Sequence, residues 1–201
     1  MQLARPIWHT KGGSPPSLEA GVGPRDVVLF TDWTLLRLFP PLRGAWAPVG
    51  SPLEVLITGE NAKAVLFGTI NPRTGHRVVL VRPTAGGADA QAFLREVRRH
   101  YPRAGTIWLL ADRASAHTDH RTQALAMQLR IRFVWLPKQA SELNAMDQLW
   151  RELKRVIAAN RQFPMVTALA AAAMLWVLML SPHEARRKAG LLSPNFWLRD
   201  L

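Results

Sequence analysis

The sequence contains no cysteine and few acidic residues, and both absences narrow what the protein can do. Without cysteine the chain has no disulfide framework, no thiol nucleophile and no cysteine-based zinc site. Asp and Glu number 14 against 26 Lys and Arg, which gives a formal net charge of +12 and a pI near 11.5. Because this excess of positive charge attracts polyanions, nucleic acid is the expected partner, ahead of an anionic membrane surface.

Long apolar runs are also scarce. The first 25 residues lack the continuous apolar core of a signal peptide and are rich in Gly, Pro and Ser. We therefore expect a flexible tail at 1–25 and a cytoplasmic protein that is nucleoid-associated when bound to DNA. Residues 163–180 form an 18-residue run without charge, which is marginal for a bilayer span of about 20 residues. Its five alanines and the basic clusters on both sides favour a helix buried in a protein core, so no membrane partner is expected.

The remaining 176 positions, 26–201, suit one domain with enough apolar residues to build a core. Period-two and continuous apolar runs predict an antiparallel meander of strands at 27–30, 53–59, 63–70 and 76–83. Helical spacing then alternates with apolar strands, at 88–101 (helix), 106–112 (strand), 117–129 (helix) and 131–137 (strand). Further helices are predicted at 144–160, 164–180 and 182–189. The alternating part implies parallel strands, so the expected class is α/β with a mixed sheet.

Three of the few acids stand where chemistry is expected. Asp32 ends the apolar segment VVLFTD and Asp112 ends TIWLLAD, and strand ends border the ligand crevice of an open α/β sheet. Asp147 follows on a helix, one turn after Asn144. If the strands are neighbours, the three carboxylates converge, repel one another and need a hard cation such as Mg²⁺ or Mn²⁺. Each Asp taken alone is more often a turn former or helix N-cap than a catalytic residue, so the case depends on the combination.

The segments around these acids resemble a known family. Asp112 and Asp147 are separated by 34 residues, within LLADRASAH and LPKQASELNAMDQLWRELKR. These segments resemble the second and third acidic motifs of DDE transposases in the insertion sequence 630 and mariner superfamily. FTDWTLLRLFPPLRGAWAPVG resembles the first motif, with Asp32 as its acid, and AGLLSPNFWL resembles the family's end. The resemblance covers about residues 26–201 and implies an RNase H-like fold, a five-stranded mixed sheet flanked by helices.

The resemblance also implies an activity. It predicts a metal-dependent transposase for cut-and-paste DNA transposition, in which Asp32, Asp112 and Asp147 are catalytic and hold two Mg²⁺ or Mn²⁺ ions. Such a pair activates water for phosphodiester hydrolysis and then a DNA 3′-hydroxyl for strand transfer. The implied partners are transposon ends and target duplex, with a homodimer as one option and no small-molecule cofactor. Residues 1–25 do not match the family's helix-turn-helix reader of transposon ends, so we expect a catalytic domain in truncated form.

Two positions depart from the family pattern and keep alternatives open. Trp33 stands where an acid often follows the first Asp, and Arg113 stands where Asn or an acid commonly follows the second. Arg113 therefore places a fixed cation beside the proposed metals. One alternative is a non-catalytic DNA-binding or dimerising transposase remnant. The other is an RNase H-like nuclease that cuts without joining.

The third motif has two helical faces. An apolar stripe predicted to face the core consists of Met146, Leu149, Trp150, Leu153 and Ile157. Another face carries Asp147, Arg151 and Lys154, where the two cations would meet phosphates or form a solvated basic face. The residues expected to contact DNA are Arg113, His117, Lys138, Asn144, Arg151, Lys154 and Arg155. For His117, orientation of the site and a structural bond to the backbone are the alternatives.

Overall fold

The computed structural model describes residues 22–39, 50, 61–138, 140–159 and 162–198. The strand expected at 53–59 and most of the expected tail at 1–25 lie outside these ranges. In chain order the elements are β1 (Val27–Arg37), β2 (Lys63–Ile70), β3 (Arg77–Arg82), α2 (Gly87–His100), β4 (Ile107–Ala111), α3 (Ser115–Thr118), α4 (His120–Gln128), β5 (Ile131–Trp135), η2 (Ser141–Leu143), α5 (Ala145–Leu153), η3 (Lys154–Ala158), α6 (Val166–Met179) and α7 (Pro182–Lys188).

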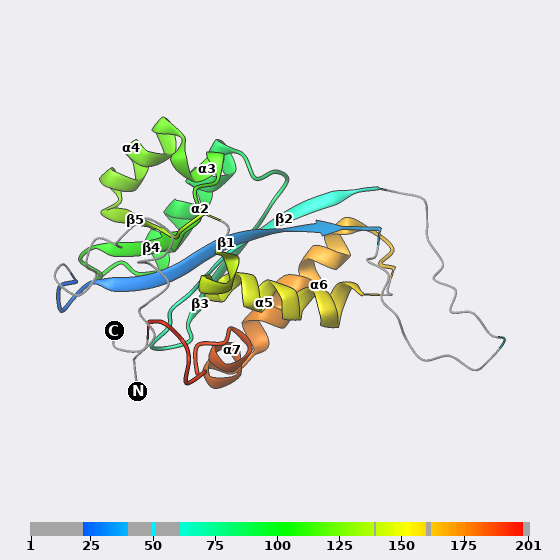
Figure 1. Cartoon of the computed structure of the whole chain (residues 1–201). Coiled ribbons are helices and arrows are strands. Elements are labelled where there is room, and N and C mark those ends of the chain that lie inside the picture. The colour runs from blue at the N-terminus through cyan, green and yellow to red at the C-terminus, as the bar shows by residue number, and fades with distance from the viewer. Residues whose placement is uncertain (1–21, 40–49, 51–60, 139, 160–161, 199–201) are drawn as a thin grey trace.

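The strands form one five-stranded mixed sheet in the order β3-β2-β1-β4-β5 (Figure 1). The pairs β1–β2 and β2–β3 are antiparallel, whereas β1–β4 and β4–β5 are parallel. This arrangement confirms the mixed sheet, with an antiparallel part followed by a parallel part, while the meander strand predicted at 53–59 lies outside the described residues. It also puts β1, which carries Asp32, in the middle of the sheet.

β1 is longer than expected, and its two halves have different neighbours. Its first half pairs with β4 from Val27↔Ile107 to Phe30↔Leu110. Its second half pairs only with β2 among the described strands, up to Arg37↔Lys63. The prediction that this strand ends at Asp32 is therefore wrong. Asp32 lies inside β1, just beyond the point where the parallel ladder with β4 stops.

Helices cover both faces of the sheet and create two apolar cores (Figure 1). Because side chains alternate along a strand, neighbouring residues of β1 enter different cores. Phe30 belongs to the core that contains buried residues of α5, α6 and α7, while Leu29 belongs to the core that contains those of α2. The second core takes the apolar stripe of α2, which is Ala90, Phe93, Leu94 and Val97. The sheet is therefore buried on both faces, as its continuous apolar strands require.

Two predicted helices are interrupted. The helix expected at 117–129 is divided at Asp119, which has extended backbone and accepts a hydrogen bond from the Thr122 N–H at 3.0 Å. Such a bond caps the N-terminus of a new helix, so α4 starts afresh after α3. The helix expected at 144–160 is α5 followed by the π-helical turn η3. Its predicted apolar stripe is confirmed, since Met146, Leu149, Trp150 and Leu153 are buried and Ile157 is partly buried.

The uncharged helix α6 packs on the sheet with one face only. Leu169, Ala170, Ala173 and Val177 are buried, whereas Leu175, Leu178 and Met179 are exposed on the opposite face. Its C-terminal carbonyl groups accept hydrogen bonds from the buried guanidinium of Arg77. Within the described ranges no single helix is long and apolar enough to cross a membrane. α6 and α7 meet the criteria only as a pair, across a bend of 109°.

Candidate active site

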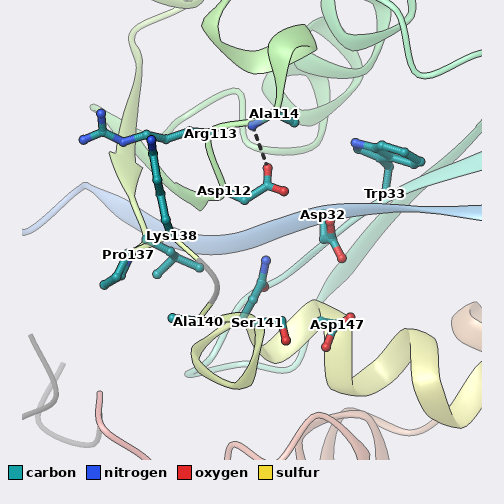
Figure 2. Close-up of a pocket in the computed structure, with 12 residues that line it drawn as sticks. Asp32, Trp33, Asp112, Arg113, Ala114, Pro137, Lys138, Ala140, Ser141 and Asp147 are labelled. Atoms are coloured by element: carbon teal, nitrogen blue, oxygen red, sulfur yellow. Dashed lines mark hydrogen bonds between the residues drawn. The ribbon is translucent and has the colours of Figure 1, made fainter. Parts of the chain in front are cut away.

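A pocket of about 620 Å³ brings the three predicted acids together from three elements (Figure 2). Asp32 comes from β1, Asp112 directly follows β4, and Asp147 lies in the first turn of α5. The full lining is Asp32, Trp33, Asp112, Arg113, Ala114, Leu136, Pro137, Lys138, Ala140, Ser141, Asn144 and Asp147. The pocket therefore lies beside the carboxyl end of β4, where ligands are expected in an α/β sheet.

The register of the sheet explains why Asp32 and Asp112 meet. The parallel ladder pairs Phe30 with Leu110, and Asp32 and Asp112 stand two positions further along their respective chains. Figure 2 shows the Asp32 side chain directed toward α5. Burial raises the pKa of Asp32 to about 7, and the negative charges of Asp112 and Asp147 add to this, although the Trp33 N–H opposes it. The pKa of Asp32 thus shows that all three acids share one electrostatic field.

A glycine in the neighbouring strand allows α5 to reach this position. Gly68 of β2 is the partner of Asp32 in the antiparallel register. A Cβ atom at Gly68 would lie 2.7 Å from Met146 Cε and 2.7 Å from two ring carbons of Trp150. The bare backbone at Gly68 therefore lets these two side chains of α5 lie directly on the sheet. Gly68 is not among the residues predicted from the sequence, although an isolated Gly inside a strand pattern signals such a close approach.

Asn144 fixes the start of α5 against β1. Its side-chain oxygen accepts a hydrogen bond from the Met146 N–H at 3.1 Å, which caps the helix. Its amide nitrogen donates to the carbonyl oxygen of Thr31 at 3.0 Å. Because Thr31 adjoins Asp32 and Met146 adjoins Asp147, one buried amide ties both acidic segments together.

Asp112 is held by its own loop and by His117. Its carboxylate accepts a hydrogen bond from the Ala114 N–H at 3.2 Å, and His117 Nδ1 lies 3.3 Å from Oδ1. The hydrogen bond from His117 lowers the pKa of Asp112. His117 is buried and its ring packs against Phe133, with the ring centroids 5.6 Å apart. His117 Nδ1 also lies 3.4 Å from the backbone carbonyl oxygen of Asp112, so the structure contains both alternatives for His117, a contact that orients the site and a bond to the backbone.

Asp147 is engaged by a cation on its own helix. Both Nε and a terminal nitrogen of Arg151 donate to Asp147 Oδ2, at 3.0 and 2.7 Å. The residues are four apart, so their side chains emerge on the same helix face. Sequence analysis expected Arg151 to meet phosphates, whereas in this structure its guanidinium is an ion-pair partner of the third acid.

The three acids share a pocket without forming a preassembled metal group. Among the residues that the structure describes, no three acidic or histidine side chains are grouped closely enough to hold a metal ion. The expected tight convergence is therefore only partly met. The donor set still fits Mg²⁺ or Mn²⁺, because it consists of carboxylates and because the charges of Asp112 and Asp147 add to burial, the main cause, in raising the pKa of Asp32.

Comparison with known proteins identifies the family. A family model described as DDE superfamily endonuclease matches residues 27–170. The chain belongs to this family. An insertion element IS630 protein of 39 kDa from Shigella sonnei, named as uncharacterized, is 26% identical over 136 residues, which are 67% of this chain and 40% of that protein. The predicted membership of the insertion sequence 630 and mariner superfamily is confirmed.

Solved transposase structures share the fold of this DDE domain. The Mos1 transposase paired-end complex with left transposon end aligns with a TM-score of 0.63 at 17% identity, over 85% of this chain and 53% of that one. The catalytic domain of Mos1 mariner transposase aligns with a TM-score of 0.60 at 16% identity, over 85% of this chain and 78% of that one. The RNase H-like fold is thus confirmed, and this chain spans about half the length of the Mos1 transposase in the paired-end complex.

The cations expected to contact DNA occupy different places in the DDE domain. Arg113 and Lys138 are exposed and line the pocket, on the side of Figure 2 away from Asp147. Arg155 pairs with Glu152 at 2.9 Å, and Lys154 lies on η3 outside the pocket lining. Asn144 and His117 are buried, so their side chains position the acids and offer little surface to DNA. Arg113 and Lys138 are therefore the candidates best placed to meet a phosphate.

Phe196 and Trp197, near the end of the described chain, contact the elements that form the pocket. The Trp197 indole N–H donates to the Leu143 carbonyl oxygen at 3.0 Å, in the turn η2 that precedes α5. Phe196 and Trp197 both pack edge-on against Phe30, with ring centroids 5.8 and 5.9 Å away. Both residues lie within AGLLSPNFWL, the part of the sequence that resembles the family's end. Its contacts indicate that it fixes the turn which presents Asp147.

Proposed function

We propose that this chain is the catalytic domain of a DNA transposase. It would hydrolyse a phosphodiester bond and then join a DNA 3′-hydroxyl to a target duplex, with Asp32, Asp112 and Asp147 as the catalytic residues. Transposon ends and target DNA would be its partners. The observation that carries the proposal is that three acids from three elements line one pocket in a chain of the DDE family.

The proposed cofactor is a pair of Mg²⁺ or Mn²⁺ ions, held by the same three acids. Structures of the Mos1 paired-end complex with Mn and with Mg are similar in fold to this chain, at TM-scores of 0.62 and 0.65. When bound, two such ions supply an activated nucleophile and a clamp on the attacking and leaving oxygens. Burial is the main cause of the raised pKa of Asp32, and the repulsion that Asp112 and Asp147 add to it supports cation binding, because a cation would relieve that repulsion.

The residues of the chain itself would position the substrate and the acids. Arg113 and Lys138 would hold the phosphate backbone at one side of the pocket through charge-assisted contacts. His117 and the Ala114 N–H keep the Asp112 carboxylate oriented. Asn144 keeps the helix of Asp147 on the strand of Asp32. Positioning and charge neutralisation are what phosphoryl transfer mainly requires of a protein.

Thermal unfolding with and without metal tests the proposed site. Mg²⁺ or Mn²⁺ should stabilise the unmodified chain, by about 2.7 kcal/mol at a concentration one hundred times the Kd. The Asp112→Asn variant should gain much less, because it loses one charged ligand. Equal melting temperatures with and without metal in the unmodified chain would refute metal binding by this pocket.

A product assay separates joining from cutting. The chain is incubated with a labelled duplex carrying a free 3′-hydroxyl, a supercoiled plasmid and Mg²⁺, and Asp112→Asn is the control. The proposal expects label covalently joined to the plasmid with the unmodified chain only. Nicked plasmid without joined label would indicate an RNase H-like nuclease instead.

One observation favours a second candidate, a non-catalytic DNA-binding transposase remnant. Arg151 already neutralises Asp147, and Arg113 lines the same pocket. These two arginines could thus supply part of the positive charge that a metal would otherwise bring to the pocket. This candidate predicts duplex binding without any metal-dependent stabilisation, so the thermal experiment decides between the two.

A further inference from the structure

Asp147 differs from the other two pocket acids in having an arginine as its partner. Arg151 donates two N–H groups to a single carboxylate oxygen, Oδ2. The pair is partly exposed, with side-chain exposures of 54% for Arg151 and 31% for Asp147. An ion pair in this setting is weak and readily exchanged, because water and salt compete with it. The guanidinium of Arg151 therefore pairs with the Asp147 carboxylate, but another cation can replace it.

We propose that Arg151 is a releasable counter-ion of Asp147 that competes with a divalent cation for this carboxylate. The inference rests on the proposed function, since it takes the three acids to be the cation's ligands. While Arg151 is bonded to Oδ2 of Asp147, this oxygen is not open to the cation. A cation that binds Oδ2 of Asp147 must displace the guanidinium, and one that binds Oδ1 is repelled by its positive charge, so Arg151 lowers the affinity of the pocket for metal.

After its release from Asp147, the Arg151 guanidinium can bind a DNA phosphate beside the pocket. Arg151 is exposed on the face of α5 that carries Asp147, so it stays near the pocket after the exchange. A phosphate oxygen of duplex DNA is a good partner for an arginine that has lost its carboxylate. Metal and DNA would then favour each other's binding. Metal binding to Asp147 frees Arg151 for a phosphate, and phosphate binding to Arg151 frees Asp147 for the metal. Thermodynamic linkage makes this coupling reciprocal.

Arg155 provides a matched control on the adjoining turn η3. It is as exposed as Arg151 and forms the same kind of ion pair, with Glu152 at 2.9 Å. Glu152 does not line the pocket. Arg151→Gln and Arg155→Gln therefore remove the same charge from nearly the same place. Only Arg151→Gln frees a carboxylate of the pocket.

The first measurement is Mn²⁺ affinity, from the electron paramagnetic resonance signal of free Mn²⁺. Arg151→Gln should bind Mn²⁺ about two- to fivefold more tightly than Arg155→Gln, the range that the loss of one exposed ion pair implies. Equal or weaker binding by Arg151→Gln would overturn the inference. The proposed function would survive that result if the unmodified chain still binds Mn²⁺ and Asp112→Asn does not. If the unmodified chain binds no Mn²⁺, both fail.

The second measurement follows the guanidinium directly. The Nε–H signals of Arg151 and Arg155 are assigned in nitrogen-15 NMR spectra by means of the two glutamine variants. Titration with Mg²⁺ should move the Arg151 signal toward that of a solvated arginine and leave the Arg155 signal in place. If Mg²⁺ binds and the Arg151 signal does not move, Arg151 is not displaced and the inference is wrong.

Discussion

Gly68→Ala gives a sharp test of how α5 is held against the sheet. The added methyl carbon would lie 2.7 Å from Met146 Cε and from two ring carbons of Trp150. Carbon atoms in favourable contact are about 3.5 to 4.0 Å apart, so the gap is short by about 1 Å. Met146 can turn its flexible end away, but the Trp150 ring is rigid and fully buried. The helix that carries Asp147 must therefore shift outward.

The expected cost follows from two opposing effects. Overpacking a core by one methyl group typically costs about 1 to 3 kcal/mol. Replacing Gly by Ala in extended backbone returns about 0.4 to 1 kcal/mol, because the unfolded chain becomes less flexible. We therefore expect the free energy of unfolding of Gly68→Ala to fall by about 1 to 2 kcal/mol. The outward shift of α5 should also reduce the stabilisation by Mg²⁺.

Urea denaturation with and without Mg²⁺ measures both effects. Gly23→Ala is the control, since the three atoms nearest to its methyl group would belong to the Asp26 carboxylate, at ordinary distances of 3.6 Å or more. In a Trp150→Phe background, which shortens the offending ring system, Gly68→Ala should cost less than in the unmodified chain. A Gly68→Ala chain as stable as the unmodified one, with the same gain from Mg²⁺, would refute the close-approach argument.

Two further predictions concern charge. Without metal, the free energy of unfolding should fall as pH rises from about 4 to about 7, because the pKa of Asp32 is raised from 3.8 to about 7 and the folded state binds more protons in this window. The fall attributable to Asp32 is at most about 4 kcal/mol, and Asp32→Asn should remove it in urea titrations at several pH values; parallel curves for the two chains would contradict the prediction. Duplex DNA should bind with a Kd of about 10⁻⁴ to 10⁻⁶ M at physiological salt. Arg113→Gln and Lys138→Gln should each lower the slope of log K against log salt by about 1 in anisotropy titrations, and an unchanged slope would mean that the residue touches no phosphate.

Much of the fold could be predicted because its apolar pattern is strong. The run at 63–70 is flanked by turn residues, and β2 has these bounds. The end of β1 could not be predicted in this way, since Thr31, Asp32 and Thr34 interrupt its apolar pattern. Pairing with β2 overrides that local signal and extends the strand to Arg37. Here tertiary contacts decided the boundary.

The candidate site, too, could be predicted in part from the sequence, whereas other parts depend on contacts between elements. The spacing of the acids and the motif around Asp147 predicted that Asp32, Asp112 and Asp147 share a pocket. The pattern could not say which partner Arg151 selects, because a residue four positions after an acid can pair with it or extend away from the helix. Nor did the apolar stripe of α5 show how closely the helix approaches the sheet. That distance depends on Gly68, which lies on a different element.

The central position of β1 has a consequence for how the chain is made. One edge of β1 pairs with β2, which is the next of the described strands along the chain. The other edge of β1 stays unpaired until β4 has been synthesised. An unpaired strand edge is a template for association with other chains. The bond between Thr31 and Asn144 closes a separation of 113 positions, and contacts of such range form slowly. Synthesis at a high level should therefore favour aggregates, because many chains with an open β1 edge are then present at once, whereas synthesis at a low level keeps such chains few.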